Sequence, residues 1–328
     1  MRIYIMAHEL TMIDGKAQMA WVGDTPWHGL GQQVEAGISP DEMMKVAGLD
    51  WTVEKTDLFY NDTLVPSQKA LVKSDDNQLL SIVGNDWNPI QNHEAFEMFN
   101  EFCENGDMQM ETAGSLKDHQ MVWGLAKVQK SFALKTPQGE DLVESYFLFS
   151  NPHQFGRSAD VRFTPIRVVC NNTLTLSLNT KAQASVKISH RTAFDKDQVL
   201  VMLGLADTKM STYQEAAEHL VSKRIQGDDL VEYFNQVFPN TYKAKTAKEA
   251  DTLIDRLSKT AKRGLEVMET QPGAELGAGS FWQAFNAATY LVDHEIGRSV
   301  DTRLQSAWFG QGQQKKVAAL QTALEMAK

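Results

Sequence analysis

The chain has 328 residues, of which 42% are hydrophobic and 23% are charged, the composition of an ordinary soluble protein. Its apolar runs are far shorter than the ~20 residues that cross a bilayer, which excludes a membrane-spanning helix. The first residues lack the apolar stretch and cleavage site of a signal peptide. The presence of only Cys103 and Cys170 argues against a disulfide scaffold and a cysteine-rich zinc site, and we expect the protein in a reducing cytoplasm.

The net charge of −10 is unevenly spread along the chain. Residues 1–150 contain 10 Lys or Arg and 23 Asp or Glu, whereas residues 151–328 contain 22 and 19. The segment 157–191 is the most basic, because Asp160 is its one acidic residue against six cations. Such local asymmetry bears more directly on the choice of partner than the net charge of the whole chain does.

The first 50 residues are rich in turn formers and end in a predicted helix. Ser39 and Glu42 form a capping box, and Pro40 suits the first helical position. From about 51 to 190 the pattern changes to short strands separated by turn residues. These strands are predicted at 51–60, 63–73, 79–84, 121–128, 143–150 and 161–169. One helix interrupts them near 91–104, so most strands are joined by turns, and this favours an antiparallel sheet.

After about residue 194 the sequence becomes helical. A long helical stretch precedes a short helix that stops at Pro239, and Thr246 with Glu249 predicts a further helix that extends to Met268. The last two helices are predicted to begin at a Ser280–Gln283 cap and after residues 310–313. We therefore predict an α+β fold. An antiparallel β-sheet core with a packed helix occupies residues 1–194, and an all-helical C-terminal region at 195–328 serves assembly or partner binding.

The basic segment supplies the candidate nucleic-acid-binding residues. Cations that point outward from a sheet follow a phosphate backbone, and exposed aromatic rings stack on bases, as in proteins that bind single strands. The predicted contacts are Arg157, Arg162, Arg167, Lys181, Lys187, Arg191, Phe155 and Phe163. The alternative is that these cations balance the acidic N-terminal half of the chain, since interspersed surface charge is common.

Other motifs give no catalytic or metal site. The Cys170-Asn171-Asn172-Thr173 cluster is typical of a tight turn with a buried thiol. The glycines of PWHGLG at 26–31 are too few for a phosphate loop, and the eight histidines show no zinc-ligand spacing. A nucleotide-binding loop and a nucleophile elbow are both missing from the sequence. We therefore predict that the protein is not an enzyme and needs no cofactor or metal.

Several segments together resemble a family of phage- and plasmid-encoded proteins with a domain of unknown function. The resemblance spans nearly the whole chain and rests on MAHEL at 6–10, PWHGLG at 26–31, RFTPIRVVCNNTL at 162–174, SFWQAFNAATYLVDHEIGR at 280–298 and DTRLQSAWFG at 301–310. It implies a mobile-element setting and no particular activity. The strand–strand–helix order with basic residues is also similar to phage single-strand annealing proteins, in which a small antiparallel sheet backed by a helix forms a basic DNA groove in rings or filaments.

Three functional hypotheses follow. The first is a protein that binds and anneals single-stranded DNA in recombination, without catalysis, as a ring-shaped or filamentous homo-oligomer. The second is an interaction protein of a mobile element, a host-takeover or anti-defence factor, whose acidic half binds a basic host protein or mimics DNA. The third is a metal-dependent enzyme that acts on nucleic acid. Fold analogy alone does not decide among them.

Overall fold

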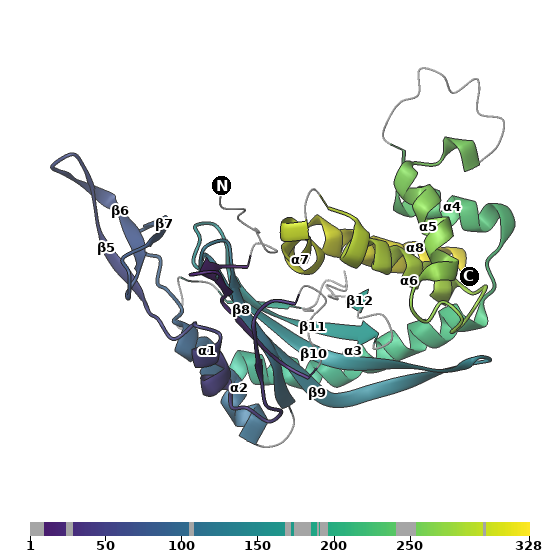
Figure 1. Cartoon of the computed structure of the whole chain (residues 1–328), viewed down its shortest axis with the longest axis horizontal. Helices are drawn as coiled ribbons and strands as arrows, with labels where there is room; N and C mark the ends of the chain where they lie inside the picture. The colour runs from purple at the N-terminus through teal and green to yellow at the C-terminus, as the bar shows by residue number, and fades with distance from the viewer. Residues whose placement is uncertain are drawn as a thin grey trace. The chain divides into compact units, whose positions relative to one another are not determined.

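The computed structural model describes residues 10–23, 29–104, 108–167, 172–173, 185–188, 190, 196–240, 254–297 and 300–328. Strands dominate the first part of the chain and helices the last part, and this confirms the predicted α+β class (Figure 1). In the described residues, no helix is both long enough and apolar enough to span a membrane.

The largest sheet has eight strands in the order β12-β11-β10-β9-β8-β3-β4, and β13 also pairs with β11. β3 and β4 pair in parallel, whereas β8 pairs antiparallel with both β3 and β9. The bounds are Met19–Val22 (β3), Gln32–Val34 (β4), Met108–Leu116 (β8), Met121–Thr136 (β9), Gly139–Pro152 (β10), Ala159–Arg167 (β11), Asn172–Thr173 (β12) and Ser185–Ile188 (β13). A two-stranded sheet of β1 (Met12–Ile13) and β2 (Lys16–Ala17) precedes β3.

The centre of this sheet is covered on both faces. Residues 121–126 of β9 and 145–152 of β10 are all buried, although successive side chains of a strand point to opposite faces. Two helices lie nearby, α1 (Pro40–Val46) and α2 (Asn92–Glu104). The ring of Phe99 on α2 meets Phe149 of β10 edge-on, with 6.4 Å between centroids. The middle of the sheet is therefore core and offers no open groove.

A separate three-stranded antiparallel sheet, which we call the arm, is formed by β5 (Val53–Tyr60), β6 (Thr63–Lys73) and β7 (Leu79–Gly84) in the order β5-β6-β7. β7 pairs only with residues 68–72 of β6, so the β5–β6 hairpin continues beyond β7 as a two-stranded ribbon (Figure 1). The turn of this hairpin is made by Asn61 and Asp62, and Asn61 has a positive φ of 50°. Asn tolerates this backbone conformation better than most residues do.

The C-terminal helices pack around α6 (Phe281–Tyr290), in which residues 281–289 are all buried. A helix that is buried on every side belongs in the middle of a bundle, and its polar side chains, Gln283, Asn286 and Thr289, donate to backbone carbonyls. The indole of Trp282 donates to Asp141 Oδ2 at 2.8 Å, and Lys316 forms a buried ion pair with Asp293 at 2.6 Å. The other helices are α3 (Lys196–Ser222), α4 (Gly227–Val237), η1 (Ile254–Arg256), α5 (Lys259–Thr270), the π-helix η2 (Leu291–Glu295), α7 (Val300–Phe309) and α8 (Gln311–Met326).

The chain forms two compact units, and neither is one continuous segment. The first contains Met1–Gln129, Ser145–Phe163 and Asn179–Ala206, and the second contains Lys130–Glu144, Thr164–Leu178 and Asp207–Lys328. The chain passes from the first unit to the second for the last time between Ala206 and Asp207, inside α3, whereas the sequence predicted a domain boundary near residue 194. The other changes of unit fall within strands β9, β10 and β11 and in the segment between β12 and β13, where the sequence pattern gave no sign of a boundary.

Most predicted elements are present. The Ser39 hydroxyl accepts the Glu42 N–H and the Ser280 hydroxyl accepts the Gln283 N–H, so these two caps are confirmed. The helix predicted to open at Thr246 is different, because α5 begins at Lys259 and is capped by Ser258, whose hydroxyl accepts the Ala261 N–H. Thr246, Glu249, Cys170 and Asn171 lie outside the described residues.

Candidate nucleic-acid interface

The turn between β10 and β11 places an aromatic ring and a cation on the surface. Phe155 is 68% exposed, Arg157 is also exposed, and Gly156 between them has a φ of 76°. The N–H of Phe155 donates to Ser81 Oγ of β7 at 3.2 Å, and the Gln154 side chain donates to the side-chain oxygen of Gln120. These contacts fix a turn that presents the side chains of Phe155 and Arg157 outward, whereas the parts of β10 and β11 that flank the turn are buried.

Arg162 is held inside the fold by the acidic residue of its own segment. Its Nε lies 3.1 Å from Asp160 Oδ1, and the same oxygen accepts the Ser150 hydroxyl at 2.8 Å. The Arg162 side chain is 16% exposed and that of Asp160 is 8% exposed. The expectation that Arg162 points outward to a phosphate is therefore corrected, because its charge is compensated by a neighbouring carboxylate.

Phe163 does not lie on the surface, where it was predicted to stack on a base. It is 4% exposed, and its ring meets Phe147 edge-on with 6.2 Å between centroids. Neighbouring residues of a strand face opposite sides, and Phe163 faces the core. It therefore offers no surface to a base, and Phe155 is the stacking candidate that remains.

The remaining candidates are placed only in part. Arg167 ends β11 and pairs with Asn172 of β12, and Lys187 of β13 pairs with Asp160 of β11. Lys181 and Arg191 lie outside the described residues. Strand pairing thus brings the basic positions of β11 and β13 to the same edge of the large sheet.

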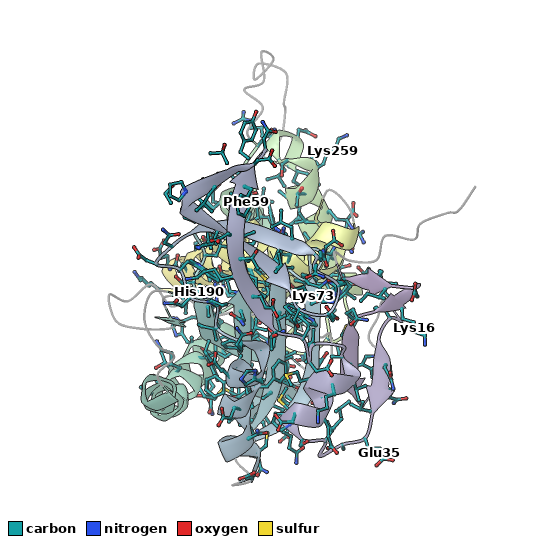
Figure 2. The ribbon with its side chains drawn as sticks, turned by 90° about the vertical axis from the view of Figure 1, so that its left-hand side faces the viewer. Lys16, Glu35, Phe59, Lys73, His190 and Lys259 are labelled. Atoms are coloured by element: carbon teal, nitrogen blue, oxygen red, sulfur yellow. The ribbon has the colours of Figure 1, made fainter. Side chains whose placement is uncertain are left out.

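A buried cluster of aromatic and polar residues lies behind this turn. The rings of His119 and His153 meet Trp51 edge-on at 5.5 and 5.4 Å, and His190 stacks on Trp87 at 4.1 Å. All three histidines are at most 3% exposed. Figure 2 labels His190 at this cluster and Lys73 at the base of the arm.

The hydrogen bonds of the cluster define which imidazole nitrogens carry protons. Asn92 Nδ2 donates to the Leu49 carbonyl, so its Oδ1 accepts from Nε2 of His153 at 3.1 Å. By the same reasoning Gln78 Nε2 donates to the Asp118 carbonyl, and its Oε1 accepts from Nδ1 of His119 at 3.0 Å. The other ring nitrogen of both histidines is buried without a hydrogen-bond partner. Both imidazoles are therefore neutral, with an unpaired acceptor in an apolar surrounding.

Burial disfavours the charged form of these rings. It lowers the pKa of His119 to about 4, with a further contribution from the nearby Lys73 charge. It lowers the pKa of His153 to about 3 and that of His190 to about 4. Within the described ranges, no group of three histidine, cysteine or acidic side chains is placed to hold a metal ion. The geometry of the cluster suits a packing role.

The turn that carries His119 has an unusual backbone. Lys117, Asp118 and His119 have φ values of 54°, 49° and 67°, three consecutive left-handed residues without a glycine. This conformation costs roughly 1–2 kcal/mol per residue. The His119 N–H donates to Thr11 Oγ1 at 3.0 Å, and the ring is inserted beside Trp51. Contacts with the rest of the cluster offset the strain.

Lys73 connects the cluster to the arm. Its ammonium lies 5.6 Å from the centre of the Trp51 ring and binds the carboxylates of Asp75 and Asp76 at 2.5 and 3.2 Å. The Lys73 side chain is 2% exposed, whereas both carboxylates are about half exposed. No sequence pattern indicates this cluster, because its members come from distant segments with no common spacing.

Comparison with known families gives one match. A family model described as a domain of unknown function, DUF932, matches residues 79–308, which include the β10–β11 turn and the three buried histidines. Comparisons with curated proteins and with solved structures give no match. Because the family model covers more than half of the chain, the protein belongs to the DUF932 family.

Proposed function

We propose that this protein binds single-stranded DNA and anneals complementary strands in the recombination of a phage or plasmid, as a homo-oligomer and without catalysis. The observation that carries the proposal is the exposed Phe155 beside the exposed Arg157 on a turn that hydrogen bonds to Ser81 and Gln120 hold in place. A ring that stacks on a base next to a cation that binds a phosphate is the arrangement used by proteins that bind single strands.

The local charge supports the same proposal. The turn opens the most basic segment of an acidic chain, and its one acid, Asp160, is occupied by Arg162. Arg157 is exposed at the start of this segment and is placed to attract a phosphate. A backbone held in this way leaves the Watson–Crick edges of the bases free to pair with a second strand.

The test is the fluorescence anisotropy of a labelled single strand of about thirty nucleotides, measured at two salt concentrations. Stacking on an aromatic side chain is worth about 1–3 kcal/mol per base, so Phe155→Ala should weaken binding about fivefold or more. Arg157→Glu should weaken binding and reduce the slope of log affinity against log salt by about 0.7, the loss of one phosphate contact.

Lys16→Glu is the matched control, because Lys16 is an exposed cation on β2, away from the basic segment. It changes the net charge by the same amount and should leave the salt slope nearly unchanged. Equal affinity of Phe155→Ala, Arg157→Glu and the natural protein would remove the turn from the interface. An absence of binding by the natural protein at low salt would overturn the proposed function itself.

A further inference from the structure

The arm exposes more large hydrophobic side chains than any other part of the described chain. Nine such side chains are exposed in the described residues, and five belong to the arm: Phe59, Tyr60, Leu64, Leu79 and Ile82. Tyr60 is 76% exposed and directly precedes the hairpin turn. Phe59 is 58% exposed and is labelled in Figure 2. A concentration of this kind on a soluble surface indicates an interaction site.

Strand register places Leu79 and Ile82 on the face of the arm opposite to most of its buried residues. Cross-strand partners share a face, and Leu79 pairs with Val72 while Ile82 pairs with Ala70. The opposite face of the arm has its own buried residues: Val53, Leu71, Lys73 and Val83. The outer face carries the Glu54 carboxylate beside Val72 and Leu79, and the neighbouring rings of Phe59 and Tyr60 point to opposite faces of the ribbon.

The outer edge of β5 is open to a further strand. Gln91 accepts the N–H of Val53 at 2.8 Å and donates to its carbonyl at 3.0 Å, so one amide side chain makes the two bonds that a neighbouring strand would make. In an antiparallel pair, outward-facing backbone groups recur at every second residue, which places those of Lys55 and Asp57 on the same edge. These groups have no backbone partner among the described residues.

The free charges of the arm are negative. Residues 51–87 contain six acids and three lysines, and every lysine is engaged. Lys69 pairs with Asp57, Lys73 with Asp75 and Asp76, and Lys55 Nζ donates to the carbonyls of Asn85 and Trp87 at 2.9 and 3.1 Å. The exposed carboxylates of Glu54, Asp62 and Asp86 remain.

We propose that the arm binds an extended protein segment in which lysine or arginine residues alternate with apolar ones, added as a strand beside β5. Backbone hydrogen bonds to Lys55 and Asp57 would hold such a segment. Its cationic side chains would lie on the face of Glu54, and its apolar side chains would lie on the opposite face, where one of the two exposed β5 rings, Phe59 or Tyr60, is placed. The net negative charge of the arm disfavours nucleic acid as the occupant. The arm therefore provides a protein-binding surface distinct from the β10–β11 turn.

The experiment uses the full chain and two labelled peptides, four lysine–valine repeats and four glutamate–valine repeats. We expect saturable binding of the lysine peptide and at least tenfold weaker binding of the glutamate peptide by anisotropy. Hydrogen exchange followed by mass spectrometry should show slower exchange in residues 53–60 when the lysine peptide is bound. Equal binding of both peptides, or binding without protection of β5, would overturn the proposal.

Two variants at one position separate strand addition from simple charge attraction. Lys55→Pro removes an outward-facing N–H without removing a bond to β6, and edge strands tolerate proline there. Lys55→Gln keeps that N–H and removes the ammonium. We expect at least a tenfold loss of peptide affinity in Lys55→Pro and little loss in Lys55→Gln.

Glu54→Lys is a further variant that leaves the backbone of β5 unchanged. It should weaken binding of the lysine peptide severalfold, and full affinity in this variant would contradict the charge argument. Single-stranded DNA binding is measured in parallel, so that failure of the arm proposal and failure of the proposed function are distinguished. Self-association of the peptide-free chain that is abolished by Lys55→Pro would identify a second copy as the occupant and overturn the basic segment.

Discussion

The side chain of Asn92 forms hydrogen bonds with both His153 and Leu49, which lies in the segment that leads into the arm. Its Oδ1 lies 3.1 Å from Nε2 of His153, and its Nδ2 donates to the carbonyl of Leu49 at 3.0 Å. Asn92 and His153 are both fully buried. One amide therefore satisfies a donor and an acceptor that come from two different segments.

Asn92→Ala should lower the free energy of unfolding by about 2–5 kcal/mol, because it leaves the His153 N–H and the Leu49 carbonyl buried without partners. Urea unfolding followed by circular dichroism measures this loss. Asn88→Ala is the control, since Asn88 is exposed and contacts His190 through its backbone. Losses of similar size in both variants would show that the amide bonds of Asn92 are unimportant.

Acid should destabilise the protein through the buried histidines. Their pKa values in the folded state, about 4, 3 and 4, lie below the usual 6.5, so below pH 6.5 the unfolded chain binds more protons. The free energy of unfolding should therefore be highest, as far as these histidines are concerned, above pH 6.5. It should decrease by up to about 1.4 kcal/mol per pH unit for each histidine as the pH decreases toward 4.

Urea unfolding at several pH values between 7 and 5 checks this expectation. His119→Asn removes one titrating ring at a position where asparagine tolerates the left-handed backbone. The slope against pH should then decrease by about one third. A stability that is constant from pH 7 to 5 in the natural protein would contradict the neutral state assigned to the cluster.

Removing the carboxylates that pair with Lys73 should lower the free energy of unfolding more than removing the lysine itself. The double variant Asp75→Asn, Asp76→Asn leaves a buried ammonium without a counter-charge, and we expect a loss of about 3 kcal/mol or more in the free energy of unfolding. Lys73→Met leaves two half-exposed carboxylates that water can solvate, so the loss should stay within about 1 kcal/mol. Urea unfolding of both variants measures the two losses. A larger loss in Lys73→Met than in the double variant would contradict the argument from burial.

Gly264 of α5 is required by the close approach of α4. A Cβ at this position would lie 2.5 Å from two ring carbons of Phe234. Gly264→Ala should therefore destabilise the protein by about 1–3 kcal/mol through overpacking, although alanine favours the helix by about 1 kcal/mol. The change in melting temperature measures this, and adding Phe234→Leu should recover part of the loss. Gly84→Ala is the control, because its Cβ would meet no atom within 4 Å.

Local signals in the sequence predicted the elements well where one residue acts on its neighbours. The Ser39–Glu42 and Ser280–Gln283 caps are of this kind, as are the strands of the arm. Strand β8 was missed because it contains Gly114, whose place is set by a distant contact. A Cβ there would lie 2.9 Å from the Gln18 carbonyl and 3.0 Å from Trp123.

The candidate site was predictable only in part, because exposure depends on the whole fold. The basic composition of the segment identified Phe155 and Arg157, but it did not reveal that Asp160 neutralises Arg162. Strand alternation alone would have shown that Arg162 and Phe163 face opposite sides. The open edge of β5 depends on the order of strands in the arm, which composition does not specify.

The interleaving of the two compact units limits how the protein can be dissected by deletion. Each unit is made of three segments, so the polypeptide passes from one unit to the other five times. A cut at any position inside the stretch from Lys130 to Ala206 divides both units, and separately expressed halves would each expose core surface. Functions of this protein therefore have to be mapped by point substitution in the full chain, because failure of a fragment would report lost folding.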